Sequence, residues 1–133
     1  MSNDDSLYTG CPVQHARQFI AGKWQMGILW NLKEKTLGFN ALQGQLPGIS
    51  AKVLMQELEF FVQKKIVDRK ALEFSSAKTE YSLSTAGNSL IPVLTAIVEW
   101  GYFNLQEEQV TREMDLTPLP AIRAIENGMA ERK

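Results

Sequence analysis

The sequence predicts an α+β domain that is mainly helical, and three observations support this fold class. Apolar residues recur at helical spacing over most of the chain. A Pro-Gly pair at residues 47–48 separates two short helical segments, and the pattern changes to alternation directly after the second of them. Because two short helices and a hairpin are the layout of a winged helix-turn-helix, we expect that fold, with a two- or three-stranded wing sheet and a long dimerisation helix.

The composition is that of one folded domain. The 133 residues suffice for a single core, and 44% hydrophobic with 22% charged residues excludes disordered, collagen-like and coiled-coil sequences. No apolar run approaches the roughly 18 residues of a membrane span, and the first ten residues lack the features of a signal peptide. The single cysteine excludes an intrachain disulfide, so we expect a cytoplasmic protein without membrane association.

Two helices are expected first. The segment 12–21 begins with proline, which suits the first helical position, and Gly22 stops it. The segment 23–35 predicts a second helix, whose apolar positions on one side are Trp24, Ile28, Leu29 and Leu32.

The helix-turn-helix candidate lies between residues 39 and 64. A short helix at 39–46 ends at the Pro-Gly pair, and Ser50 caps a second helix at 50–64. Ile49, just before the cap, is expected to pack on Leu54 as a hydrophobic staple. The outward stripe of the second helix consists of Lys52, Gln56, Glu59 and Gln63.

A hairpin and a long helix follow. The segment 66–84 predicts the hairpin, with a polar loop at 75–78. The segment 85–108 predicts a helix about 36 Å long, in which Pro92 predicts an early kink. Since this helix is apolar on more than one face, we expect a second subunit to cover part of it.

We expect three parts along the chain, which shows no internal repeat. Residues 1–10 form a disordered or loosely ordered arm, residues 11–110 the winged helix domain, and residues 111–133 a C-terminal helical extension with a last helix near 118–130.

A series of short motifs along residues 11–105 carries a family resemblance. The motifs include Cys11-Pro12-Val13, Gly22-Lys23-Trp24, Phe39-Asn40, Pro47-Gly48-Ile49-Ser50, Leu58-Glu59, Ile66-Val67, Glu80-Tyr81-Ser82-Leu83 and Trp100-Gly101. In this order the set resembles the HxlR family of bacterial winged helix-turn-helix transcriptional regulators, relatives of the MarR type. The resemblance implies a homodimer whose first and long C-terminal helices form the interface, and recognition helices that enter successive major grooves of double-stranded operator DNA.

The resemblance also implies a sequence-specific regulator, which we expect to be a repressor that responds to a small-molecule effector or a redox signal. The expected DNA-binding residues lie on the two short helices and on the wing: Asn40, Ser50, Ala51, Lys52, Gln56, Arg69, Ser75, Ser76 and Lys78. A solvated helix face and an ordinary polar hairpin are the alternative interpretations of these residues.

The sequence departs from the family where basic residues are usual. Gly38, the segment 43–45 and Glu57 stand at such positions, and Lys65 replaces a common glycine. Because phosphate neutralisation supplies most non-specific affinity, we expect weakened DNA binding and a flattened salt dependence. The alternative function is a winged-helix protein-interaction module that has lost DNA binding.

Cys11 is a candidate redox or electrophile sensor, a use that many family members make of a cysteine at this place. It begins a helix, where unpaired N–H groups and the helix dipole favour the thiolate, and His15 follows one turn later. The alternative is a small buried apolar side chain. Since Cys11 and His15 supply only two ligands, we expect no metal site, and no cofactor is expected.

The expected dimer interface consists of apolar side chains from the first and long helices: Val13, Phe19, Ile20, Leu90, Leu94, Ile97, Val98, Trp100 and Phe103. The chain has more large rings than a small core holds, so we expect core plus interface, with a pocket for an aromatic effector as the alternative. The sequence has no nucleophile elbow and no glycine-rich phosphate loop, and we expect no enzyme activity.

Overall fold

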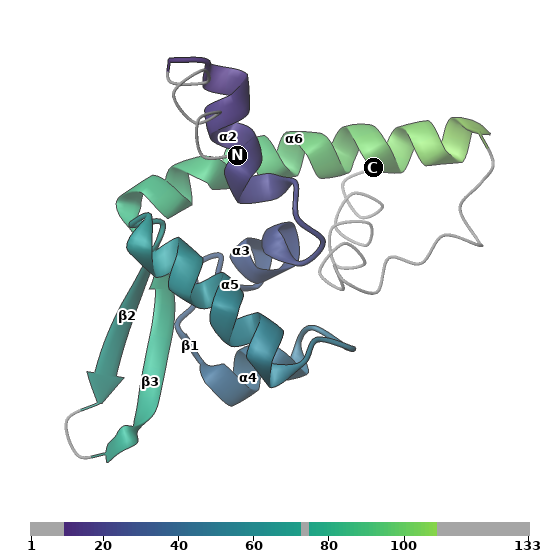
Figure 1. Ribbon diagram of the computed structural model, residues 1–133. Helices are drawn as coiled ribbons and strands as arrows, with labels where there is room; N and C mark the ends of the chain where they lie inside the picture. Colours follow the sequence, from purple (N-terminus) through teal and green to yellow (C-terminus); the bar gives the residue numbers. More distant parts are fainter. Residues whose placement is uncertain (1–9, 73–74, 109–133) are drawn as a thin grey trace.

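The computed structural model describes residues 10–72 and 75–108 and has the winged helix-turn-helix fold that the sequence predicts (Figure 1). The elements follow in the order α2 (Pro12–Ile20), α3 (Gln25–Asn31), β1 (Leu37–Gly38), α4 (Phe39–Gly44), α5 (Ala51–Gln63), β2 (Val67–Leu72), β3 (Ser75–Leu83) and α6 (Thr85–Glu108). The predictions for the arm, Gly10 apart, and for the extension at 111–133 fall outside the described residues.

Side chains from every helix in the described residues and from the sheet meet in one hydrophobic core. Ile49 and Leu54 both belong to it, as the hydrophobic staple predicts. Since burying such a side chain contributes about 1.5–3 kcal/mol, the inner face of α5 is held firmly against the domain. The larger side chains with no exposed surface are Ile28, Leu29, Leu42, Leu46, Leu54, Leu58, Phe61 and Leu94.

The wing is a three-stranded antiparallel sheet in the order β1-β3-β2. Strand β3 pairs with β1 through Leu37↔Tyr81 and with β2 from Val67↔Leu83 outward. The prediction of a polar loop at residues 75–78 is wrong, because β3 already begins at Ser75. Backbone pairing with β2 continues outward through a register shift, and this pairing, not side-chain polarity, sets the length of the strand.

Helix α3 is shorter than the segment 23–35 predicted from the sequence. It ends at Asn31, and Glu34, at a φ of 55°, then turns the chain toward β1. At the other end, the Gln25 side chain accepts a hydrogen bond from the Gly22 N–H at 2.7 Å and donates one to the Gln18 carbonyl at 2.7 Å. This buried amide joins α2 to α3.

Helix α5 ends in a Schellman motif at Lys65. The Ile66 N–H donates to the Phe61 carbonyl at 2.9 Å, and the Lys65 N–H donates to the Val62 carbonyl at 3.0 Å. Lys65 has a φ of 63°, in the left-handed region that favours glycine. The fold therefore requires at this position the conformation for which glycine is the usual residue.

Ser84 and Gly87 form a tight corner between the wing and α6. The Ile66 carbonyl at the base of the wing accepts a hydrogen bond from the Ser84 N–H at 3.0 Å. The Ser84 hydroxyl hydrogen is shared between the Lys65 carbonyl at 2.7 Å and the Ile66 carbonyl at 2.9 Å. The Gly87 N–H donates to the Ser84 hydroxyl oxygen at 3.0 Å, which caps α6. A Cβ added at Gly87 would lie 2.2 Å from the Ile66 carbonyl oxygen, so only glycine fits here.

Candidate nucleic-acid interface

A tight turn sets α4 against α5. The Ile49 N–H donates to the Leu46 carbonyl at 3.1 Å, and Gly48 has a φ of 94°. Proline followed by a positive-φ glycine is the signature of a type II turn. A Cβ at Gly48 would lie 3.7 Å from Cη2 of Trp24, so the indole packs beside the turn. This packing fixes where the first residues of α5 emerge.

The amino-terminal half of α5 presents an exposed face. Ser50 is the N-cap, since its side-chain oxygen accepts a hydrogen bond from the Val53 N–H at 3.1 Å, as the sequence predicts. Ala51, Lys52 and Gln56 are exposed, while the opposite side of α5 lies in the core. The expected residue on the neighbouring helix, Asn40 in α4, is also exposed.

The wing carries exposed lysines on both of its longer strands, Lys70 on β2 and Lys78 on β3. Lys78 lies on β3 and is exposed, whereas the side chains of Ser75 and Ser76 lie outside what the structure describes.

The wing's arginine is engaged by α5. Arg69 Nη1 lies 2.5 Å from Glu59 Oε2, and the hydrogen bond and charge of Glu59 raise the pKa of Arg69. The sequence predicted Arg69 as a DNA-binding residue without a protein partner, and Glu59 was missed. The signal was available, because Glu59 belongs to the outward stripe of a helix that leads directly into β2.

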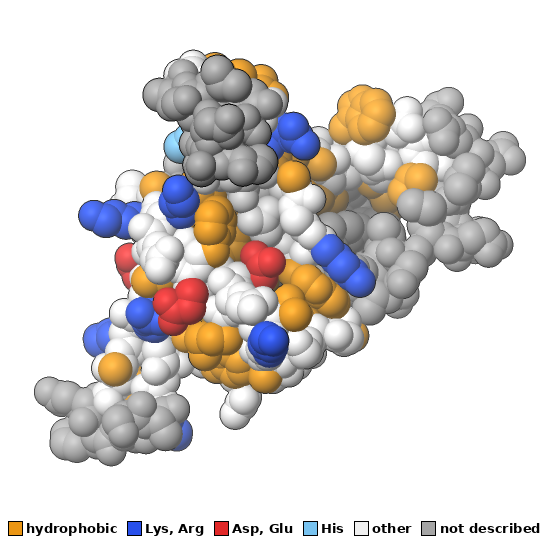
Figure 2. All heavy atoms as spheres, in the orientation of Figure 1, with side chains coloured by type: hydrophobic (Ala, Val, Ile, Leu, Met, Phe, Trp, Pro, Cys, Tyr) orange, Lys and Arg blue, Asp and Glu red, His pale blue; other side chains and the backbone are white. Residues whose placement is uncertain are grey.

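The charges around α5 are mixed in sign. Figure 2 shows Lys and Arg side chains interspersed with Asp and Glu side chains on the face that carries α5, with hydrophobic side chains between them. Glu57 on α5 is half-buried, and its burial raises the pKa of the carboxyl. Any attraction of this face for an anionic partner therefore comes from individual cations and not from a uniform positive field.

Cys11 stands at the N-cap position of α2 as a half-buried free thiol. The His15 N–H donates to the Cys11 carbonyl at 3.0 Å. The His15 ring packs edge-on against Phe19, with 5.5 Å between ring centroids, and its Nδ1 lies 3.3 Å from Gln18 Nε2.

The residues expected at a dimer interface divide into two groups. Phe19, Leu94 and Val98 are buried within their own chain, and Ile20 and Leu90 pack partly against the core. The remaining residues are exposed, together with Val93, which sequence reasoning did not name. Their exposed fractions are 64% for Val13, 43% for Val93, 41% for Ile97, 70% for Trp100 and 51% for Phe103.

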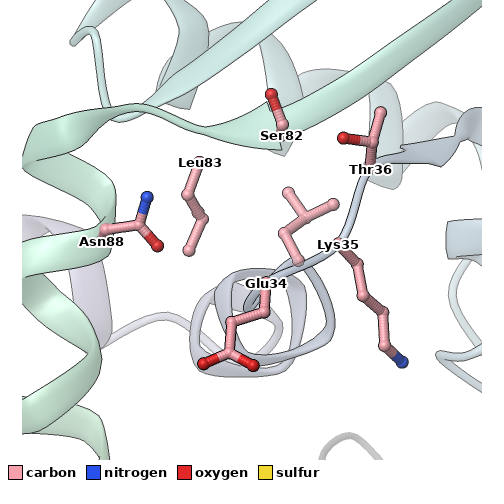
Figure 3. Close-up of a pocket in the computed structure, with 7 residues that line it drawn as sticks. Glu34, Lys35, Thr36, Ser82, Leu83 and Asn88 are labelled. Carbon is pink, nitrogen blue, oxygen red and sulfur yellow. The ribbon is translucent and has the colours of Figure 1, made fainter.

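A cleft of about 260 Å³ lies between the segment after α3, the end of β3 and the start of α6. Figure 3 shows side chains from these three segments around it, with Asn88 contributed by α6. The lining contains no aromatic ring, so this cleft is not the ring-lined effector pocket considered from the sequence. The residues that line it are Leu32, Glu34, Lys35, Thr36, Ser82, Leu83 and Asn88.

Comparisons with known proteins identify the family. The HxlR-like helix-turn-helix family matches residues 19–109. The uncharacterized HTH-type transcriptional regulator YdzF of Bacillus subtilis (strain 168) is 34% identical over 91 residues, which are 68% of this chain and 84% of YdzF.

Two solved structures are similar in fold. A putative MarR-family transcriptional regulator from Porphyromonas gingivalis W83 is 32% identical with a TM-score of 0.66, over 72% of this chain and 94% of that one. The redox regulator HypR in its reduced form is 28% identical with a TM-score of 0.69, over 74% and 97%. Within the part of the chain that the structure describes, no helix is long and apolar enough to cross a membrane. The chain thus belongs to the HxlR-like helix-turn-helix family and is a transcriptional regulator with a winged, MarR-like fold.

Proposed function

We propose that the protein binds double-stranded operator DNA sequence-specifically and regulates transcription as a homodimer. The observation that carries this proposal is the exposed amino-terminal half of α5, where Lys52 and Gln56 face solvent on a helix anchored by its other side. Recognition helices of this fold read bases with residues near their amino ends. Lysine binds phosphate or guanine and glutamine pairs with adenine, so these two side chains supply base and backbone contacts. Lys78 supports a contact between the wing and the DNA backbone.

The homodimer is supported by the exposed apolar residues of α6. Val93, Ile97 and Trp100 follow at spacings of four and three, which places them on one face of the helix. Leu94 and Val98 lie on the adjoining face and are buried in their own chain. One helix therefore has an apolar side for its own core and another for a second copy.

We further propose a cytoplasmic repressor without enzyme activity that responds to a small molecule or a redox signal. The regulator family supports the first part, and the similarity to a redox regulator, with a free thiol at the start of α2, supports the second. Peroxide or quinone should lower the operator affinity of the wild type and leave Cys11→Ser unaffected. An equal loss in Cys11→Ser would remove Cys11 from the mechanism.

The decisive experiment selects bound duplexes from genomic fragments and measures their affinities for variants. Lys52→Ala combined with Gln56→Ala should lower affinity for the selected operator at least about tenfold, since each good base contact is worth about 1–3 kcal/mol. Gln63→Ala, an exposed glutamine at the far end of α5, is the matched control and should bind normally. Unchanged affinity in a folded double variant would contradict the assignment of this face to DNA.

A protein-interaction module without DNA binding is the second candidate, and it is favoured by Glu57 on α5, which stands where the family usually has a basic residue. Duplex binding that weakens steeply with salt, and that one sequence competes far better than others, would decide for DNA. Salt-insensitive or absent duplex binding would decide for the module.

A further inference from the structure

We propose that Glu59 is a positioning residue that holds Arg69 of the wing on the recognition helix and so withholds this cation from DNA phosphate. The inference rests on the proposed DNA-binding function and names a residue pair that limits the affinity of the same surface. Arg69 Nη1 lies 2.5 Å from Glu59 Oε2, and the pair joins β2 to α5. The side chains keep exposed fractions of 38% and 43%, so the pair lies where an incoming phosphate can reach it.

A carboxylate and a phosphate oxygen compete for the same guanidinium. Both accept charge-assisted hydrogen bonds from arginine, and both match the planar fork of N–H donors at the edge of its guanidinium. While Glu59 neutralises Arg69, that arginine adds little to the cations that displace counterions from DNA. Because exposed ion pairs are individually weak, the competition should be modest, with an affinity effect of about twofold to fivefold.

The experiment measures duplex affinity over a salt series of about 50 to 200 mM for single and combined variants. Glu59→Gln should bind about twofold to fivefold tighter than wild type, and its slope of log affinity against log salt should steepen by about 0.9, the value for one added phosphate contact. In an Arg69→Ala background, Glu59→Gln should give no such gain. Asp68→Asn, which removes an exposed acidic charge one position from Arg69 on β2, controls for the loss of negative charge alone.

A second variant separates geometry from charge. Glu59→Asp keeps the carboxylate but shortens its reach, so it should also tighten binding, by less than Glu59→Gln. It gives an independent answer if Glu59→Gln proves unstable by thermal unfolding.

The outcomes separate the inference from the function beneath it. A gain no larger than that of Asp68→Asn, a gain that survives Arg69→Ala, or weaker binding by Glu59→Gln would each overturn the inference. Wild-type duplex binding without an Arg69-dependent gain refutes the inference alone. Absence of duplex binding by wild type and all variants refutes the proposed function as well.

Discussion

Replacing Gly87 by alanine tests the corner between the wing and α6. The added Cβ would lie 2.2 Å from the Ile66 carbonyl oxygen, far inside van der Waals contact, and 3.2 Å from Leu83 Cδ2. The first turn of α6 must therefore move away from the Ile66 carbonyl. This carbonyl accepts two hydrogen bonds from Ser84, and the movement weakens both. The corner has no flexible side chain at the closest contact to absorb the strain.

The expected loss follows from three contributions. Overpacking costs about 1–3 kcal/mol, two weakened hydrogen bonds cost about 1 kcal/mol each, and alanine gains about 1 kcal/mol over glycine in a helix. Gly87→Ala should therefore lower the free energy of unfolding by about 2–4 kcal/mol in urea titrations followed by circular dichroism. Gly101→Ala, in the same helix with nothing within 4 Å of its added Cβ, should be neutral or stabilising. Wild-type stability in Gly87→Ala would refute the reasoning.

Three further predictions concern strain, ionisation and assembly. Lys65→Gly should raise the free energy of unfolding by about 0.5–1 kcal/mol, because relief of the left-handed φ exceeds the added backbone entropy, and Lys65→Ala should not. Burial raises the pKa of Glu57 above its ordinary 4.5, so the free energy of unfolding of the wild type falls as the pH rises from that value. In urea titrations at pH 7, Glu57→Gln should be more stable than wild type by less than about 1 kcal/mol. Below pH 4.5 this difference should disappear. Trp100→Ser should raise the dimer dissociation constant more than about tenfold in sedimentation equilibrium while the unfolding transition of the protomer is retained.

The parts of the fold predicted best are those with strong local signals. The Pro-Gly pair marks the end of α4 through turn chemistry, and Ser50 marks the start of α5 through capping. Both signals depend on a few neighbouring residues. The start of α6 at Thr85 is the one that the apolar pattern predicts. The sequence also indicated the special position of Lys65 through its departure from a common glycine, and the structure gives the reason in its positive φ.

The parts that sequence reasoning missed depend on contacts between distant segments. Strand β1 is only two residues long and exists because it pairs with β3 more than forty positions later. Periodicity places Glu59 on the outward stripe of α5, but it does not show that Arg69 on β2, beyond the junction of the two elements, lies against it. On α6 the apolar pattern does not distinguish Leu94, which faces its own core, from Ile97, which stays exposed.

The corner at Ser84 joins the hairpin of β2 and β3 rigidly to α6. The hydrogen bonds of Ser84 and the lack of a side chain at Gly87 hold the first turn of α6 in close contact with the Ile66 carbonyl. A tilt of α6 would therefore swing the hairpin through the same angle, and the displacement would grow toward the hairpin's far end. The distance between two hairpins in an assembled pair would then be set by the angle at which their long helices cross.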